Sequence, residues 1–150
     1  RFAPRSYAPD TLVVAGYDAQ SKRHALVTLV KGVGEAARAE SAAALCDLAV
    51  GGSHAYATDA EGRILRADIS SNNASSSGGG AGALTPWLHP HSGPASVALS
   101  QPSAGLAVAS AGEEGRVCVT LASASAPTTL HDARGAASFR AVCWASVSQV

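Results

Sequence analysis

Hydrophobic and polar residues alternate in short segments along most of the chain, and clusters of turn-forming residues separate these segments. In the clearest example, alternating segments at 94–100, 106–110 and 116–122 are separated by the turn clusters QPSAG and AGEEG. A period of two places every second side chain on one face of a β-strand. The pattern therefore predicts a β-rich fold of short strands joined by tight turns.

The alternating segments recur as a repeated unit. The stretch TDAEGR at 58–63 matches AGEEGR at 111–116, and an apolar strand pattern follows each of them. A Gly/Ser-rich stretch at 70–83 has no apolar period, and we expect it to be a flexible insertion between the second and third units. Without this insertion, the spacing of the matching glycines is close to the roughly 40–45 residues of a propeller blade.

The repeat divides the chain into units that we expect at about 8–31, 44–69 and 91–122, with the start of another at 138–150. Each unit would be a group of antiparallel strands. Residues 34–48 are the exception, because they are rich in alanine and other strong helix formers. A short helix is as consistent with that segment as a strand is.

The third unit resembles a repeat of the WD40 β-propeller family. In that family a histidine, a serine or threonine, an acid and a tryptophan form a hydrogen-bonded network. His91, Ser110 and Glu114 match the first three of these positions. Thr120 stands where the family has its tryptophan, so the resemblance implies that the network is broken in this unit.

The second unit departs from the family pattern in a similar way. Ala67 takes the tryptophan position, although Asp68 keeps the aspartate that follows it. The repeat positions that the resemblance assigns across the chain are Tyr17, Asp18, Asp59, Gly62, Asp68, His91, Ser110, Glu114 and Gly115. All of them are expected to have structural roles.

Four longer parts of the chain are similar, in order and spacing, to the degenerate repeats of WD-repeat nucleoporins in the Y-shaped scaffold complex of the nuclear pore. They are LVVAGYDAQ (12–20), CDLAV with YATDAEGRI (46–50 and 56–64), VASAGEEGRVCV (108–119) and HDARGAASFRAVCWA (131–145). The resemblance implies an all-β, WD40-like propeller of seven blades, of which this chain would form roughly the first half. Half a ring would leave blade faces uncovered, so we expect the 150 residues to aggregate or stay molten.

The function that the resemblance implies is structural. It implies a scaffold without catalytic activity, cofactor or metal, which supports nucleocytoplasmic transport at the nuclear envelope. The expected partner is an α-helical solenoid nucleoporin of the short arm of the Y-complex. The residues that would contact this partner are not identified by the sequence.

Charge and cysteine content narrow the classes of function. The chain has 11 basic and 11 acidic residues and no basic stripe, which argues against direct nucleic-acid binding. No apolar run approaches the roughly 20 residues of a membrane-spanning helix, so we expect no membrane insertion. Cys46, Cys118 and Cys143 are too widely spaced for a zinc or disulfide motif, which favours reduced thiols.

Two other readings of the sequence stay open. Gly32, Gly34 and Ala37 follow an apolar strand in the spacing G-x-G-x-x-A, and Asp59 lies about twenty residues further on. This spacing is typical of a dinucleotide-binding enzyme, although Asp59 also belongs to the repeated turn. The other alternative is a different WD-repeat adaptor, such as a ubiquitin-ligase substrate receptor or a chromatin-linked scaffold.

A metal site is a weaker possibility. His89 and His91 are alternate residues, and on an extended chain they would project to the same side. No third ligand lies nearby in the sequence, and His91 already has a place in the repeat. The prediction is therefore that the protein holds no metal.

Overall fold

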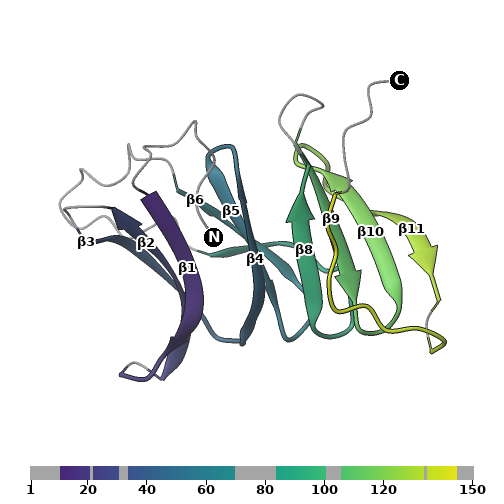
Figure 1. The fold of residues 1–150 in the computed structure, drawn as a ribbon, viewed down its shortest axis with the longest axis horizontal. Coiled ribbons are helices and arrows are strands. Elements are labelled where there is room, and N and C mark those ends of the chain that lie inside the picture. Colours follow the sequence, from purple (N-terminus) through teal and green to yellow (C-terminus); the bar gives the residue numbers. More distant parts are fainter. Residues whose placement is uncertain are drawn as a thin grey trace.

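Three antiparallel β-sheets make up the described part of the chain (Figure 1). The computed structural model describes residues 11–20, 22–30, 34–69, 84–100, 106–133 and 135–144, and no helix occurs among them. Sheet 1 contains β1 (Thr11–Asp18), β2 (Arg23–Val30) and β3 (Gly34–Ser41). Sheet 2 contains β4 (Leu45–Gly51), β5 (His54–Asp59), β6 (Ile64–Asp68) and β7 (Thr85–Leu88). Sheet 3 contains β8 (Ala95–Leu99), β9 (Ala107–Gly112), β10 (Arg116–Leu121) and β11 (Thr128–Asp132), and the all-β class is confirmed for these residues.

Within each sheet the strands follow one another in chain order, so each sheet is an up-and-down meander. The three sheets lie side by side, and β4 packs against β8 while β1 contacts β4 (Figure 1). Because sheets 2 and 3 each have four strands, the chain returns to the same end before it starts the next sheet. The first strands β4 and β8 therefore run in the same direction.

Sheet 1 corresponds to the second, third and fourth strands of the other two sheets. A residue with positive φ precedes an arginine at the same turn in all three: Lys22 (φ 56), Gly62 (φ 84) and Gly115 (φ 91). These turns join β1 to β2, β5 to β6 and β9 to β10. Strand β1 thus matches β5 and β9, which explains why it runs antiparallel to β4.

Apolar side chains on both faces of sheet 2 hold the three sheets together. Alternate residues of β5 point in opposite directions: Ala55 and Ala57 pack with Val13 and Leu26 of sheet 1. Tyr56 points to the other side and packs in a second cluster with Val97 of β8 and Val108 of β9, both in sheet 3. Burial of this tyrosine in the cluster raises the pKa of its phenol. Each face of sheet 2 is therefore an interface between sheets.

The half-buried carboxylate of Asp47 adds a polar connection between sheets 2 and 3. Asp47 Oδ2 on β4 accepts hydrogen bonds from the backbone N–H of Val97 (3.0 Å) and from Ser96 Oγ (2.7 Å) on β8. Its other oxygen, Oδ1, accepts the backbone N–H of Leu48 at 2.8 Å. A charged acceptor in the middle of an apolar strand is thus satisfied by donors from its own strand and from the next sheet.

The same relation is repeated at the far side of sheet 3. Ser96 occupies the place of Asp47 in its sheet, and its Oγ accepts the backbone N–H of Val142 at 3.3 Å. Two residues further on, the indole N–H of Trp144 donates to the carbonyl of Ala98 at 3.4 Å. Residues 137–144 form no strand, yet they run along β8 much as β8 runs along β4.

The structure corrects two expectations from the sequence and decides one open alternative. One further strand follows each of the three expected units, namely β3, β7 and β11. The insertion at 70–83 lies outside the described residues, and it falls between β6 and β7 within one sheet instead of between two units. Of the two alternatives left open for 34–48, the structure shows strand, because this segment contains β3 and the start of β4.

The helix formers of β3 are placed in a strand by their tertiary contacts. Ala39 pairs with Leu26 and is buried, while Glu40 pairs with Ala25 and remains exposed. Packing of this kind commonly overrides helix propensity, which amounts to less than about 1 kcal/mol per residue. No helix in the described part of the chain is long and apolar enough to cross a membrane.

Replacing Asp47 by alanine should destabilise the protein. The substitution leaves the donors on Leu48, Ser96 and Val97 without their acceptor, and we expect a loss of about 2–4 kcal/mol in the free energy of unfolding. Glu40→Ala is the matched control, because this acid is exposed and forms a 3.4 Å ion pair with the exposed Arg23. Urea unfolding at a fixed protein concentration measures both, and equal midpoints would contradict the role of Asp47.

Candidate functional site

The chemistry-bearing residues that the sequence singles out gather at two matching turns, between β5 and β6 and between β9 and β10. Each turn is crossed by the segment that leaves its sheet. The backbone N–H of His91 donates to the carbonyl of Gly62 at 3.3 Å, and that of Ala133 donates to Gly115 at 2.9 Å. A Cβ on Gly62 would overlap the carbonyl of His91, and one on Gly115 would lie 2.5 Å from the carbonyl of Ala137. Close approach and positive φ therefore both require glycine here.

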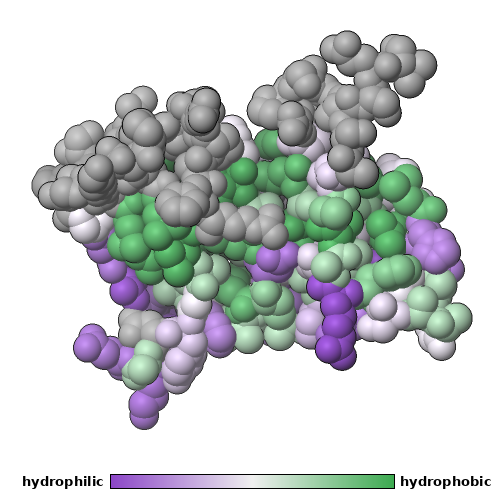
Figure 2. All heavy atoms as spheres, viewed as in Figure 1, coloured by the Kyte–Doolittle hydropathy of each residue, from purple (hydrophilic) through white to green (hydrophobic). Residues whose placement is uncertain are grey.

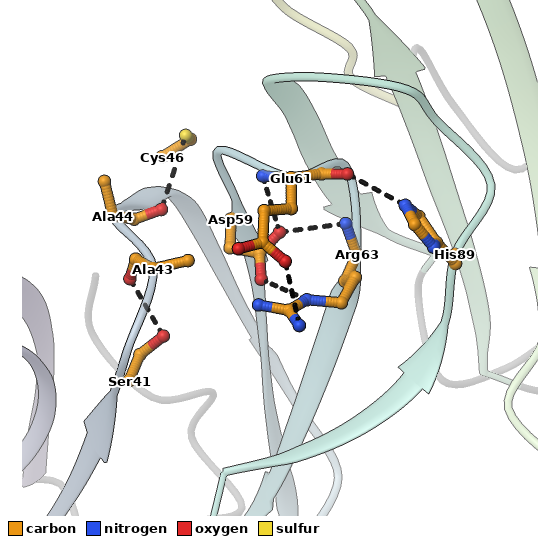
Figure 3. Close-up of polar contacts among 8 residues, drawn as sticks. All are labelled: Ser41, Ala43, Ala44, Cys46, Asp59, Glu61, Arg63 and His89. Atoms are coloured by element: carbon orange, nitrogen blue, oxygen red, sulfur yellow. Dashed lines mark hydrogen bonds and ion pairs between the residues drawn. The ribbon is translucent and has the colours of Figure 1, made fainter.

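In the first turn, Asp59 organises the backbone (Figure 3). Its side chain is fully buried, and Oδ1 accepts the backbone N–H groups of Glu61 (3.0 Å) and Arg63 (2.9 Å). Oδ2 pairs with Nε of Arg63 at 2.7 Å, and this hydrogen bond raises the pKa of the guanidinium. His89 Nε2 lies 2.8 Å from the carbonyl of Glu61. All these contacts fix the shape of the turn.

In the second turn, His91 joins two elements of sheet 3. Its Nδ1 lies 2.6 Å from Glu114 Oε1 in the turn, and its Nε2 lies 2.8 Å from Ser110 Oγ on β9. The expectation that this network is broken is therefore wrong for three of its four positions. Thr120, which replaces the tryptophan of the fourth position, is buried on β10.

The order serine, histidine, acid is also that of a hydrolase triad, which is recognised by geometry and roles. A nucleophilic serine must reach a substrate, but Ser110 is 1% exposed and lies in a central strand that is buried along its whole length. The histidine side chain is fully buried as well. The geometry therefore supports a structural cross-link in which His91, in the segment between β7 and β8, joins strand β9 to the turn between β9 and β10.

The two turns obtain their carboxylate from different positions. Asp59 corresponds to Gly112 in the second turn, and a Cβ on Gly112 would overlap the carboxylate of Glu114. The absence of a side chain at Gly112 thus makes room for Glu114 to turn inward to His91. Sequence analysis identified Glu114 but missed this dependence on Gly112, and the Asp-to-Gly change between the two turns is the signal for it.

The remaining repeat positions are Tyr17, Asp18 and Asp68. Tyr17 on β1 is 59% exposed, and its ring centroid lies 5.2 Å from that of His24. Asp18 ends β1, and its side chain lies outside the described residues. Asp68 ends β6 opposite His54 and is half-buried.

Several cavities flank the second turn, and two of them are lined by residues that the sequence analysis singled out. One of about 260 Å³ is lined by His89, Pro90, His91, Ser92, Glu114 and Arg116. The other, of about 500 Å³, lies between β4, β8 and the segment at 139–142, and Cys46 lines it. Burial, followed by the charges of Asp59, Glu113 and Asp47, raises the pKa of the Cys46 thiol. A raised pKa disfavours the thiolate at neutral pH, so this geometry does not activate a cysteine nucleophile.

The dinucleotide hypothesis for residues 32–37 is contradicted. A phosphate-binding glycine turn opens a helix whose N-terminus holds the negative charge. Gly34 instead begins the antiparallel strand β3, and Asp59 is buried against Arg63. Gly32 lies outside the described residues.

A metal site finds no support at the two histidines. His89 and His91 have separate hydrogen-bond partners, and the described residues contain no group of three potential metal ligands.

Comparison with known proteins gives no match, either to a family model or to a curated protein.

Alanine at Gly62 should be strongly unfavourable. Its φ of 84 and the carbonyl of His91 leave no room for a Cβ, so we expect Gly62→Ala to lower the free energy of unfolding by about 2 kcal/mol or more. Gly93→Ala is the matched control, because nothing lies within 4 Å of a Cβ there and its φ is not positive. The urea midpoints of the two variants should differ. Equal midpoints would show that the His91 carbonyl does not lie close enough to Gly62 to exclude a Cβ.

Loss of the Glu114 carboxylate should weaken the His91 network. Glu114→Ala removes the partner of a buried imidazole nitrogen, and we expect a loss of about 1–3 kcal/mol. Its neighbour Glu113 is exposed, so Glu113→Ala should change stability by no more than about 0.5 kcal/mol. Thermal unfolding followed by circular dichroism compares the two variants. A Glu114→Ala protein as stable as Glu113→Ala would contradict the cross-link.

Proposed function

We propose that this protein is a WD40-like β-propeller that works as a non-catalytic scaffold for protein assembly. The observation that carries the proposal is a hydrogen bond that recurs at the first strands of sheets 2 and 3. Val97 N–H on β8 donates to Asp47 on β4, and Val142 N–H, in a segment that forms no strand, donates to Ser96 at the equivalent position on β8. A regular step of this kind from one four-stranded sheet to the next segment of the chain is what a propeller requires.

The polar residues favour a scaffold over a catalyst. Asp59 holds a turn, His91 ties a linker to a strand, and Asp47 joins two sheets. Side chains of the types that usually perform catalysis are thus engaged in maintaining the fold. A rigid array of sheets offers its rims and exposed turns to partners and needs no reactive group for that purpose.

Within this class we infer a scaffold subunit of the nuclear pore Y-complex. The support is the similarity of residues 12–20, 108–119 and 131–145 to the WD-repeat nucleoporins of that complex. The partner would be an α-helical solenoid nucleoporin of the short arm. The location would be the nuclear envelope, where the complex supports the transport of protein and mRNA.

Another WD-repeat adaptor, such as a ubiquitin-ligase substrate receptor or a chromatin-linked scaffold, would use the same array of sheets. The two functions differ in their partners and not in the geometry of the fold. A dinucleotide-binding enzyme is not proposed, because the glycine turn leads into β3.

The partners can be identified by affinity purification of the tagged full-length protein from its own cells, followed by crosslinking mass spectrometry. We expect to recover Y-complex nucleoporins, with crosslinks from Lys22 in the turn between β1 and β2 to a helical solenoid. An unrelated propeller with the same tag is the control. Recovery of ligase or chromatin components would instead favour the adaptor, and the absence of any specific protein partner would contradict a scaffold.

A further inference from the structure

Three consecutive parts of the chain form walls of the cavity of about 500 Å³ beside Cys46. The first wall is the start of β4 with Cys46 and Asp47, the second is residues 94–96 at the start of β8, and the third is residues 139–142. The third wall forms no strand and runs beside β8 (Figure 1). Figure 2 shows hydrophilic residues among hydrophobic ones on the surface over β4 and β8. The position of the third wall therefore sets the width of a partly polar cavity.

One serine connects all three walls. Ser96 is 8% exposed, and its Oγ donates to Asp47 Oδ2 at 2.7 Å and accepts the backbone N–H of Val142 at 3.3 Å. A hydroxyl has a single proton to donate, a carboxylate only accepts and a backbone N–H only donates. The direction of both bonds is therefore fixed. The groups form a chain that leads from Val142 N–H through the Ser96 hydroxyl to the Asp47 carboxylate.

The segment has two other attachments, and neither of them uses this chain of bonds. The backbone N–H of Phe139 donates to the carbonyl of Gly112 at 3.3 Å, and the indole N–H of Trp144 donates to the carbonyl of Ala98 at 3.4 Å. Both acceptors are backbone groups of sheet 3, which the strands keep in place. The attachment at Val142 differs because its acceptor is a hydroxyl, which can rotate.

The carboxylate of Asp47 determines how well this hydroxyl accepts. It takes the proton of Ser96, which leaves the lone pairs of Oγ for Val142, and its charge polarises the O–H bond. Polarisation along a chain of hydrogen bonds strengthens each bond in it. Without the carboxylate, the hydroxyl turns its proton toward other acceptors and is a weaker acceptor itself.

We propose that Asp47 holds residues 139–144 in place through Ser96, so that the first and third walls of the cavity are coupled. Asp47 is then a positioning residue, whose effect on the third wall passes through the serine hydroxyl. A contact that draws Asp47 away from Ser96 at the first wall loosens the third wall. This coupling goes beyond the proposed function, because it depends on these bonds and not on the identity of the partner.

Hydrogen–deuterium exchange of the full-length protein, read by mass spectrometry, tests the coupling. Ser96→Ala removes the acceptor of Val142 N–H, and we expect exchange in residues 139–144 to become roughly fivefold faster. Asp47→Ala should accelerate exchange in the same residues although the serine is retained. Combining the two substitutions should add little to the effect of Ser96→Ala, because both act on one chain of bonds.

Three further variants are measured in parallel. Ser100→Ala is the matched control, because this serine is also 8% exposed but accepts the backbone N–H of Ala107 within sheet 3, so exchange in 139–144 should stay at the wild-type rate. Ser96→Thr keeps the hydroxyl and should also retain the wild-type rate. Asp47→Asn keeps the shape of the side chain and removes its charge, so the test remains in place if the alanine variant does not fold.

Exchange in β1 and β2 reports whether each variant is folded. Wild-type exchange of residues 139–144 in Ser96→Ala would overturn the proposal. Wild-type exchange of these residues in a folded Asp47→Ala or Asp47→Asn protein would overturn it as well, because the serine would then act without the carboxylate. Neither result bears on the partners recovered from cells, so the scaffold function is tested separately.

Discussion

The need to cover both faces of each sheet is the constraint on which this structure depends. All six residues of β9 are buried, and so are five of the six in β5. A strand in that situation cannot stand at the surface of a two-layer fold, because its second face would meet water. Sheet stacking follows, and the alanines of β5 and β9 allow close approach while Tyr56 fills the remaining space.

That constraint explains which strands could be predicted from sequence. Strands with alternating apolar residues, such as β8 and β10, stand out because one or both of their faces are buried. The last strand of each sheet is harder to recognise in the sequence. Strand β3 has helix formers, β7 has four residues including Pro86, and β11 is exposed throughout. Outer strands bury few apolar side chains, so the alternation of apolar and polar residues is weak there. Only the turn residues that flank these strands indicate where they lie. The relation of sheet 1 to the others became visible only from its turn geometry.

The candidate site was predictable in its residues and not in its connections. The family resemblance identifies His91, Ser110 and Glu114, but the absence of a tryptophan at Thr120 predicts that their network is broken. The hydrogen bonds of His91 involve the serine and the acid directly, so they survive the loss of the fourth member. Asp47 was not predicted at all. An acid between Cys46 and Leu48 in an apolar segment was the available signal, since a carboxylate that is partly withdrawn from water needs hydrogen-bond donors from the protein.

Comparison of the two turns shows how the same turn can be built from different residues. Each turn needs one inward carboxylate and one glycine that the departing segment can cross. Asp59 supplies the carboxylate before its turn, and Glu114 supplies it within the other, where Gly112 leaves the space. Because the requirement is local, the acid can change position as long as a nearby side chain is lost. The two turns therefore differ in sequence while each keeps a carboxylate that is held by hydrogen bonds and a glycine that the next segment crosses.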